Sequence, residues 1–185
     1  MKRWEATVGA GHASPVVADG RVVLHSRQGD REVTRAFDLT SGKELWRNEY
    51  PAPYTMNSAA RGHGPGPKST PVVAGDRVFT FGISGILSAH DLASGRVLWR
   101  TNAPQAPPEF GTAMSPIVVD SHVVVHLGAN DSGALTAFDV ATGTAAVAIE
   151  LTRRYGCRVV GVDQSAEMLA EGRRRVDAAG LSTAV

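Results

Sequence analysis

The chain has a single cysteine among its 185 residues, Cys157, and no cysteines paired at zinc-binding spacing. An internal disulfide is therefore excluded, and so is a zinc site built from paired cysteines. Nineteen Lys and Arg against eighteen Asp and Glu leave a net charge of +1, so no excess of one sign indicates a nucleic acid or an anionic membrane as partner. With 43% apolar residues the chain can still form a core, and we expect a globular protein.

Long hydrophobic runs are also absent. The N-terminal stretch MKRWEATVGAGHASPVV begins with basic residues, but it has no apolar run behind them and is not a secretory signal as written. The longest apolar runs, such as Val123 to Val125, are too short to cross a membrane. On this basis the sequence predicts a cytoplasmic protein without a membrane or nucleic-acid partner.

Three segments of the chain repeat one another. They are SPVVADGRVVLHS with TRAFDLTSGKELW, TPVVAGDRVFTFG with LSAHDLASGRVLW, and SPIVVDSHVVVHLG with LTAFDVATGTAAV. Asp38, Asp91 and Asp139 stand 53 and 48 residues apart, which suits one four-stranded propeller blade per repeat. In each copy a Ser/Thr-Pro pair precedes a strand, a tight turn leads into an apolar strand, and Asp-x-x-Ser/Thr-Gly forms a second turn. The sequence therefore predicts a mainly β protein, a partial β-propeller of about three four-stranded blades.

Tryptophan marks the end of the repeats. Trp46 and Trp99 stand in the last strands of the first two copies, Trp4 stands at the corresponding place before the first copy, and Val147 occupies it in the third. AFDLTSGKELW and AHDLASGRVLW resemble the docking motif of the pyrroloquinoline-quinone-like (PQQ-like) β-propeller family. The resemblance covers residues 4–144. It implies that each tryptophan packs flat between adjacent blades, near the glycine of the turn.

The same resemblance implies a range of functions. Some members of the family are quinone-dependent dehydrogenases, which resemble one another in a vicinal cysteine pair and a calcium site, whereas others are scaffolds for protein assembly. This chain has no adjacent cysteines, so we expect a noncatalytic binding or scaffold module with neither PQQ nor a metal ion. The expected partner is a protein, or a second copy through open sheet edges. Family members are often exported, in contrast to the cytoplasmic prediction above.

The longest polar insertion is the best candidate for a binding loop. It is YTMNSAARGHGPGPKSTP, residues 54–71, which is rich in glycine and contains Asn57, Arg61, His63 and Lys68. Loops of this kind on a rigid scaffold often bind ligands, although a solvated connection between two blades has the same composition. Pro67, which separates Gly66 from Lys68, argues against a phosphate-binding loop.

The hydrophobic period changes after Thr144. Residues 145–155 have the pattern of an amphipathic helix, residues 157–163 (CRVVGVD) that of a buried parallel strand, and Ser165 can cap a second helix. Residues 139–181 resemble the N-terminal half of a class I S-adenosylmethionine-dependent methyltransferase. The resemblance implies a glycine turn between Asp139 and Gly143 beside the methionine part of the cofactor, and Asp163 as the acceptor of the ribose hydroxyl groups.

That glycine turn is incomplete, because alanine stands at two of the family's three glycine positions, Ala141 and Ala145. A methyl group there opposes close approach of a cofactor, so we expect weak binding of S-adenosylmethionine or none. An equal alternative is that Asp163 only ends a strand and caps the next helix. We therefore divide the chain into a partial PQQ-like propeller, residues 1–144, and a truncated Rossmann-like α/β segment, residues 145–185. The candidate cofactor-binding residues are Asp139, Gly143 and Asp163, and no catalytic residue is predicted.

Three functions follow from these patterns. The first is a noncatalytic scaffold. The second is an S-adenosylmethionine-dependent methyltransferase, truncated and without expected activity. The third is a fragment of a quinone-dependent oxidoreductase.

Overall fold

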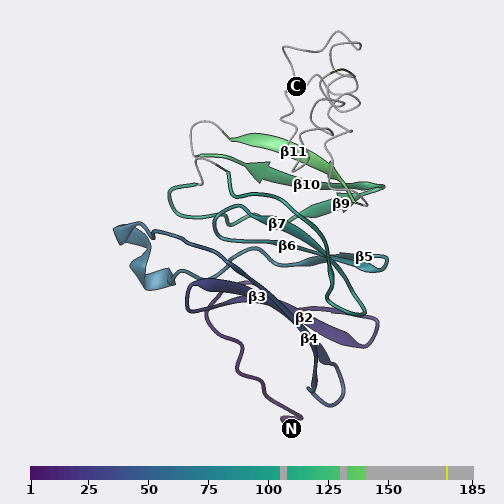
Figure 1. The fold of residues 1–185 in the computed structure, drawn as a ribbon. Coiled ribbons are helices and arrows are strands. Elements are labelled where there is room, and N and C mark those ends of the chain that lie inside the picture. Colours follow the sequence, from purple (N-terminus) through teal and green to yellow (C-terminus); the bar gives the residue numbers. More distant parts are fainter. Residues whose placement is uncertain (105–107, 130–132, 141–173, 175–185) are drawn as a thin grey trace.

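Three antiparallel β-sheets are stacked side by side in a computed structural model of the chain, which describes residues 1–104, 108–129, 133–140 and 174 (Figure 1). Blade 1 consists of β1 (Val16–Ala18), β2 (Arg21–Gln28), β3 (Arg31–Asp38) and β4 (Glu44–Pro51). Blade 2 consists of β5 (Val72–Ala74), β6 (Arg77–Phe81), β7 (Leu87–Asp91) and β8 (Val97–Arg100). Blade 3 consists of β9 (Ile117–Val119), β10 (His122–Leu127) and β11 (Ala134–Asp139). A short 3-10 helix, η1 (Ser58–His63), lies between β4 and β5.

The prediction of a mainly β protein built from successive blades is confirmed. Blades 1 and 2 each pair four strands in chain order, and blade 3 pairs three strands within the described residues. Of the predicted Rossmann-like segment, residues 145–185, only Arg174 is described, so the predicted helices and strand lie outside the described residues, as do Gly143 and Asp163. Within the described ranges, no helix is long and apolar enough to cross a membrane.

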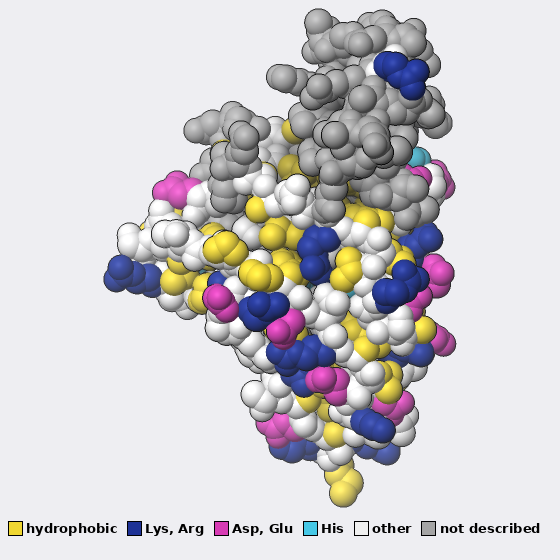
Figure 2. Space-filling model, viewed as in Figure 1, with side chains coloured by type: hydrophobic (Ala, Val, Ile, Leu, Met, Phe, Trp, Pro, Cys, Tyr) yellow, Lys and Arg dark blue, Asp and Glu magenta, His cyan; other side chains and the backbone are white. Residues whose placement is uncertain are grey.

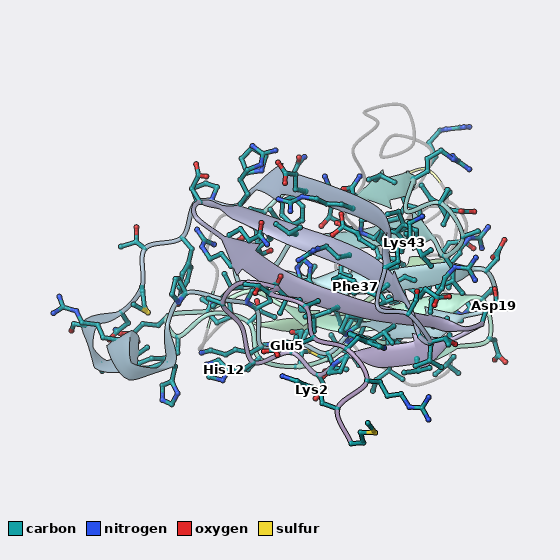
Figure 3. The ribbon with its side chains drawn as sticks, turned by 90° about the horizontal axis from the view of Figure 1, so that it is seen from below. Lys2, Glu5, His12, Asp19, Phe37 and Lys43 are labelled. Atoms are coloured by element: carbon teal, nitrogen blue, oxygen red, sulfur yellow. The ribbon has the colours of Figure 1, made fainter. Side chains whose placement is uncertain are left out.

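The two ends of the blades differ. Because consecutive strands are antiparallel, the β1–β2 and β3–β4 turns lie at one end, which we call the turn end. The β2–β3 and β6–β7 loops and the connections between blades lie at the other, which we call the loop end. Asp19 and Gly20, with φ of 45° and 68°, form the tight β1–β2 turn. Figure 3 shows Asp19 and Lys43 at the turn end and His12 towards the loop end.

Aspartate side chains hold the β3–β4 and β7–β8 turns, as the repeat predicts. Asp38 Oδ1 accepts hydrogen bonds from the Ser41 hydroxyl and the Ser41 N–H, both at 2.7 Å. Asp91 Oδ1 accepts the same pair from Ser94, at 2.6 and 2.8 Å. These hydrogen bonds to the charged form lower the pKa of both carboxyl groups. In the third copy, Asp139 and Val140 are described and the rest of the turn is not.

The two described turn glycines, Gly42 and Gly95, each receive a tryptophan from the preceding repeat, so the predicted packing of the indole near the turn glycine is confirmed for Trp4 and Trp46. A Cβ atom on Gly42 would lie 2.6 Å from the Trp4 ring, and one on Gly95 would lie 2.4 Å from the Trp46 ring. Both glycines have φ of 73°, in the left-handed region. Only glycine satisfies both the turn conformation and the space left by the indole.

Each indole also stacks on the residue that precedes the aspartate of the repeat. The pairs are Trp4 with Phe37, Trp46 with His90, and Trp99 with Phe138, with ring centroids 6.3, 6.3 and 6.2 Å apart. The indole N–H groups donate to backbone carbonyls of the same turns, at Leu39, Leu92 and Val140. The repeat thus specifies how one blade attaches to the next.

Apolar side chains fill the spaces between blades. Val23, Ala36, Trp46, Val78 and Leu92 form the buried cluster between blades 1 and 2. A larger cluster joins blades 2 and 3 and contains Phe79, Phe81, Leu87, Ala89, Val123, Val125 and Phe138. Positive and negative side chains are interspersed on the described part of the face seen in Figure 2, in keeping with the near-zero net charge.

His90 differs from its equivalents in the other blades, Phe37 and Phe138. It is fully buried against Trp46, and its Nε2 lies 3.4 Å from the Thr80 hydroxyl. Burial lowers the pKa of His90 to about 3, and the positive charge of Arg100 acts in the same direction. His90 is therefore neutral in the folded protein at physiological pH.

His90 should make the fold sensitive to acid. Between the ordinary histidine pKa of about 6.5 and the folded value of about 3, the unfolded chain binds a proton that the folded chain does not. The free energy of unfolding should therefore fall as the pH drops below about 6.5. His90→Phe, which copies blades 1 and 3, should lose less stability between pH 7 and pH 5 in urea titrations than wild type. The exposed control His63→Gln should behave as wild type, and equal losses in wild type and His90→Phe would contradict this assignment.

Candidate functional site

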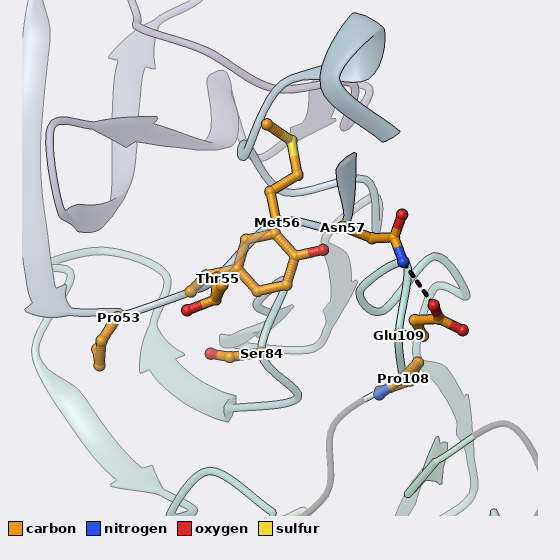
Figure 4. A pocket seen from close by; sticks show the side chains of 8 residues that line it. Pro53, Thr55, Met56, Asn57, Ser84, Pro108 and Glu109 are labelled. Carbon is orange, nitrogen blue, oxygen red and sulfur yellow. Dashed lines mark hydrogen bonds between the residues drawn. The ribbon is translucent and has the colours of Figure 1, made fainter. Parts of the chain in front are cut away.

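A cavity of about 420 Å³ opens at the loop end. Among the described residues it is lined by Pro53, Tyr54, Thr55, Met56, Asn57, Ser84, Pro108 and Glu109 (Figure 4). They come from three separate connections: β4 to η1, β6 to β7, and β8 to β9. Four of them belong to the predicted binding loop, residues 54–71, and the other predicted residues of that loop, Arg61, His63 and Lys68, are not in the lining.

Asn57 ties two of these connections together. Its side-chain oxygen accepts a hydrogen bond from the Ala59 N–H at 2.8 Å and so caps η1. Its amide nitrogen donates to Glu109 Oε1 across the cavity mouth (Figure 4). A second tie joins the connection between η1 and β5 to that between β8 and β9, because Lys68 Nζ donates to the carbonyl of Phe110 at 2.7 Å. The walls formed by these loops are thereby held in place before any ligand binds.

The third wall, the β6–β7 loop, is held by backbone contacts. The Thr112 N–H donates to the carbonyl of Ile83 at 2.8 Å, which places the β8–β9 connection against this loop. A Cβ atom on Gly111 would lie 2.5 Å from Ile83 and 3.1 Å from the Tyr54 hydroxyl. Gly111 has φ of 75°, so glycine at this position permits both the backbone conformation and the close approach of the three connections.

A buried carboxylate supports the β6–β7 loop from blade 1. Glu32, on β3, is fully buried and accepts hydrogen bonds from the Tyr50 hydroxyl and, at 2.8 Å, from the Ile83 N–H. His25 Nε2 lies 3.4 Å from the same carboxylate, and the Arg100 guanidinium lies 4.2 Å from the centre of the Tyr50 ring. Ile83 is the neighbour of Ser84 in the cavity lining, so this cluster fixes one wall of the cavity.

The electrostatics of the cluster favour an ionised Glu32. Burial alone would raise the pKa of Glu32. The hydrogen bond and charge of His25 lower this pKa, and so do the hydrogen bonds from Tyr50 and Ile83. Together these interactions outweigh burial, and the pKa of Glu32 is lowered. Burial and the neighbouring carboxylate raise the pKa of Tyr50 well above its usual value. Glu32 therefore acts as an acceptor that joins blades 1 and 2. No motif in the sequence marks this residue.

Of the three predicted cofactor-binding residues, only Asp139 lies in the described part of the structure. Asp139 ends β11 opposite His122, at the turn end, whereas the cavity lies at the loop end. Gly143 and Asp163 lie outside the described residues, so this cofactor site stays a prediction. Where the structure is described, no group of three His, Cys, Asp or Glu side chains is arranged to hold a metal ion.

Comparison with known proteins establishes the family. The family model for outer membrane protein assembly factor BamB matches residues 2–62 and 29–176. The chain belongs to the BamB family. It is 32% identical over 147 residues to the outer membrane protein assembly factor BamB of Shewanella oneidensis, covering 76% of this chain and 34% of that protein. The chain thus spans about a third of the length of this BamB relative.

Solved structures share the fold of this BamB-family chain. A europium-containing methanol dehydrogenase superposes with a TM-score of 0.53 at 21% identity, over 72% of this chain and 23% of the other. A quinohemoprotein alcohol dehydrogenase from Pseudomonas putida gives a TM-score of 0.52 at 23% identity, over 72% and 19%. At such identities the likeness shows the fold alone.

The comparisons support one of the two family resemblances noted in the sequence and not the other. They support the PQQ-like propeller and give no support to a methyltransferase segment. The second range matched by the BamB model ends at residue 176, so it includes most of residues 139–181, for which the methyltransferase resemblance was noted.

Proposed function

We propose that this chain is a noncatalytic protein-binding module that acts in the assembly of outer-membrane proteins, and that its partner binds at the loop-end cavity. Membership of the BamB family is the observation that carries the proposal, because the matched relative is named as an assembly factor. This function also places the protein in the cell envelope, in contrast to the cytoplasmic location that the sequence predicts.

The cavity is suited to a protein partner. Its walls combine apolar groups of Pro53, Met56 and Pro108 with the hydroxyl groups of Tyr54 and Thr55. Protein-binding surfaces typically have such a mixture, with an apolar centre and polar groups at the edge. The hydrogen bonds across the three connections hold the cavity open before binding, which lowers the entropy cost of association.

Peptide binding tests the proposal. Strands of outer-membrane barrels alternate apolar and polar residues over about ten positions. Fluorescent peptides with this alternation should bind the protein saturably, as measured by fluorescence anisotropy, and scrambled peptides should bind more weakly. Thr55→Trp, which adds bulk at an exposed position of the cavity lining, should weaken binding, whereas Thr40→Trp at the turn end should not. Equal binding by both variants would exclude the cavity as the site.

The methyltransferase alternative is tested separately. If Asp139, Gly143 and Asp163 form a cofactor site, calorimetric titration with S-adenosylmethionine should show saturable heat that Asp163→Ala abolishes. We expect no heat at millimolar cofactor, because of Ala141 and Ala145.

A further inference from the structure

Glu109 is the one charged residue in the described lining of the cavity. Its side chain is exposed, and Asn57 occupies one carboxylate oxygen, Oε1. None of the ion pairs among the described residues includes Glu109. The cavity mouth therefore carries a negative charge with a second oxygen, Oε2, available to accept hydrogen bonds.

The surrounding groups match a long cationic side chain. Lysine and arginine have an apolar stem and a charged head. Pro53, Met56 and Pro108 offer apolar contacts to such a stem, and the Tyr54 ring offers an aromatic surface that attracts cations. A guanidinium group donates up to five hydrogen bonds and binds carboxylates in a fixed geometry, so arginine suits the Glu109 carboxylate better than lysine.

The position of Glu109 is fixed by the fold. Asn57 caps η1 through its oxygen and holds Glu109 through its nitrogen, so the carboxylate is oriented by a residue that is itself anchored. Lys68, a basic residue of the connection between β4 and β5, donates to the carbonyl of Phe110. Charge complementarity thus favours a basic group supplied from outside.

We infer that the loop-end cavity binds an arginine side chain of the partner protein, with Glu109 accepting its guanidinium and Tyr54, Met56 and the two prolines enclosing its stem. This inference rests on the proposed function, since it specifies which residue of the partner enters the cavity.

A peptide series that differs at one central residue tests the inference. The peptides share the alternating sequence and carry arginine, citrulline, tyrosine or glutamate at the centre. Citrulline keeps the shape of arginine and removes its charge. At low salt we expect the arginine peptide to bind about 3- to 10-fold more tightly than the citrulline peptide, as for a partly exposed ion pair beside an aromatic ring. The difference should decrease as the salt concentration rises.

Substitution of Glu109 assigns the effect to this carboxylate. Glu109→Gln should abolish the difference between the arginine and citrulline peptides, and Asp76→Asn, an exposed acidic position at the turn end, should leave it unchanged. Glu109→Lys should reverse the preference, so that the glutamate peptide binds more tightly than the arginine peptide. Circular dichroism should show that all three variants keep the wild-type fold, because both positions are exposed.

The inference and the proposed function fail in different ways. Equal binding of arginine and citrulline peptides, tighter binding of the tyrosine peptide, or a difference that persists in Glu109→Gln overturns the inference and leaves the proposed function standing. If no peptide binds, the proposed function fails. The inference is then tested with N-acetylarginine amide. The NMR signals of this compound should broaden when wild-type protein is added and should not broaden with Glu109→Gln. If they do not broaden with wild-type protein, the inference is overturned.

Discussion

Replacing Trp46 with alanine should lower the free energy of unfolding by about 3–5 kcal/mol, the range found for large aromatic residues removed from a core. Trp46 is 8% exposed and belongs to the cluster between blades 1 and 2. Alanine would leave an empty volume against Gly95 and His90 and would remove the hydrogen bond to the Leu92 carbonyl, 2.9 Å long in the wild type. Urea unfolding monitored by circular dichroism measures the loss.

Trp4 provides a matched comparison in the same chain. It makes the same contacts with its turn, on Gly42 and the Leu39 carbonyl, but it is only half-buried. Trp4→Ala should therefore cost clearly less than Trp46→Ala, because less apolar surface is lost from the core. An equal loss in the two variants would show that the contact with the turn glycine, and not burial between blades, determines how much the free energy of unfolding falls.

A double-mutant cycle isolates the contact between Trp46 and Gly95. Gly95→Ala alone should destabilise the protein, since the added Cβ would lie 2.4 Å from the indole and φ is 73°. In the double variant Trp46→Ala with Gly95→Ala, the methyl group enters space that the indole has left. The combined loss should be smaller than the sum of the single losses. Strict additivity would contradict the described packing.

Local sequence signals predicted the repeating parts of the fold. Pro15, Pro71 and Pro116 each come directly before a first strand, β1, β5 or β9. The aspartates of the turns and the tryptophans that dock on the glycines also recur at fixed positions. Such features follow from residues close together in the chain, so the pattern of one repeat specifies the local structure of each blade.

The buried polar cluster had no comparable signal. Glu32 stands beside Arg31 in β3, whose sequence REVTRAFD does not alternate strictly between polar and apolar residues, and a glutamate in a strand normally lies on the solvent face. In the stacked arrangement, blade 1 is covered by the β6–β7 loop of blade 2, and the burial pattern of β3 includes adjacent buried residues. Burial at this position depends on a neighbour 51 residues away in the chain, which strand periodicity does not reveal.

The cavity was predicted in part. Tyr54 to Asn57 lie in the insertion that the sequence indicated as a binding loop, whereas Ser84 and Glu109 come from connections in which the sequence indicated no binding residue. These residues line one cavity because the stacking of the blades brings their connections together. Lys68, chosen from the sequence as a candidate ligand-binding residue, instead holds the walls together through the Phe110 carbonyl.

Glu32→Ala should destabilise the protein by about 3–5 kcal/mol, as expected when one member of a buried, hydrogen-bonded ionic cluster is removed. The substitution leaves the Tyr50 hydroxyl and the Ile83 N–H without their acceptor in a region that water does not reach. Glu32→Gln, which keeps the shape and one acceptor oxygen, should cost less. Urea unfolding at pH 7 measures the stability of both variants. If Glu32→Ala were as stable as wild type, the cluster would contribute nothing to the free energy of unfolding.

The pH dependence of Glu32→Gln separates charge from shape. Because the pKa of Glu32 is lowered in the folded state, its contribution is present above about pH 4.5 and is lost as the pH falls further. Wild type should therefore lose more stability than Glu32→Gln between pH 5 and pH 3.5. The same comparison in the His90→Phe background removes the acid sensitivity that His90 contributes.

The same variants connect stability to binding. Glu32 holds the Ile83 N–H, and Ser84, next in the chain, lines the cavity. If the carboxylate fixes this wall, Glu32→Gln should weaken peptide binding at the cavity under conditions where the protein remains fully folded. His90→Phe, which changes the core away from this loop, should not. Unchanged peptide affinity in folded Glu32→Gln would mean that the contacts of Thr112 and Gly111 with Ile83 are sufficient to position the wall.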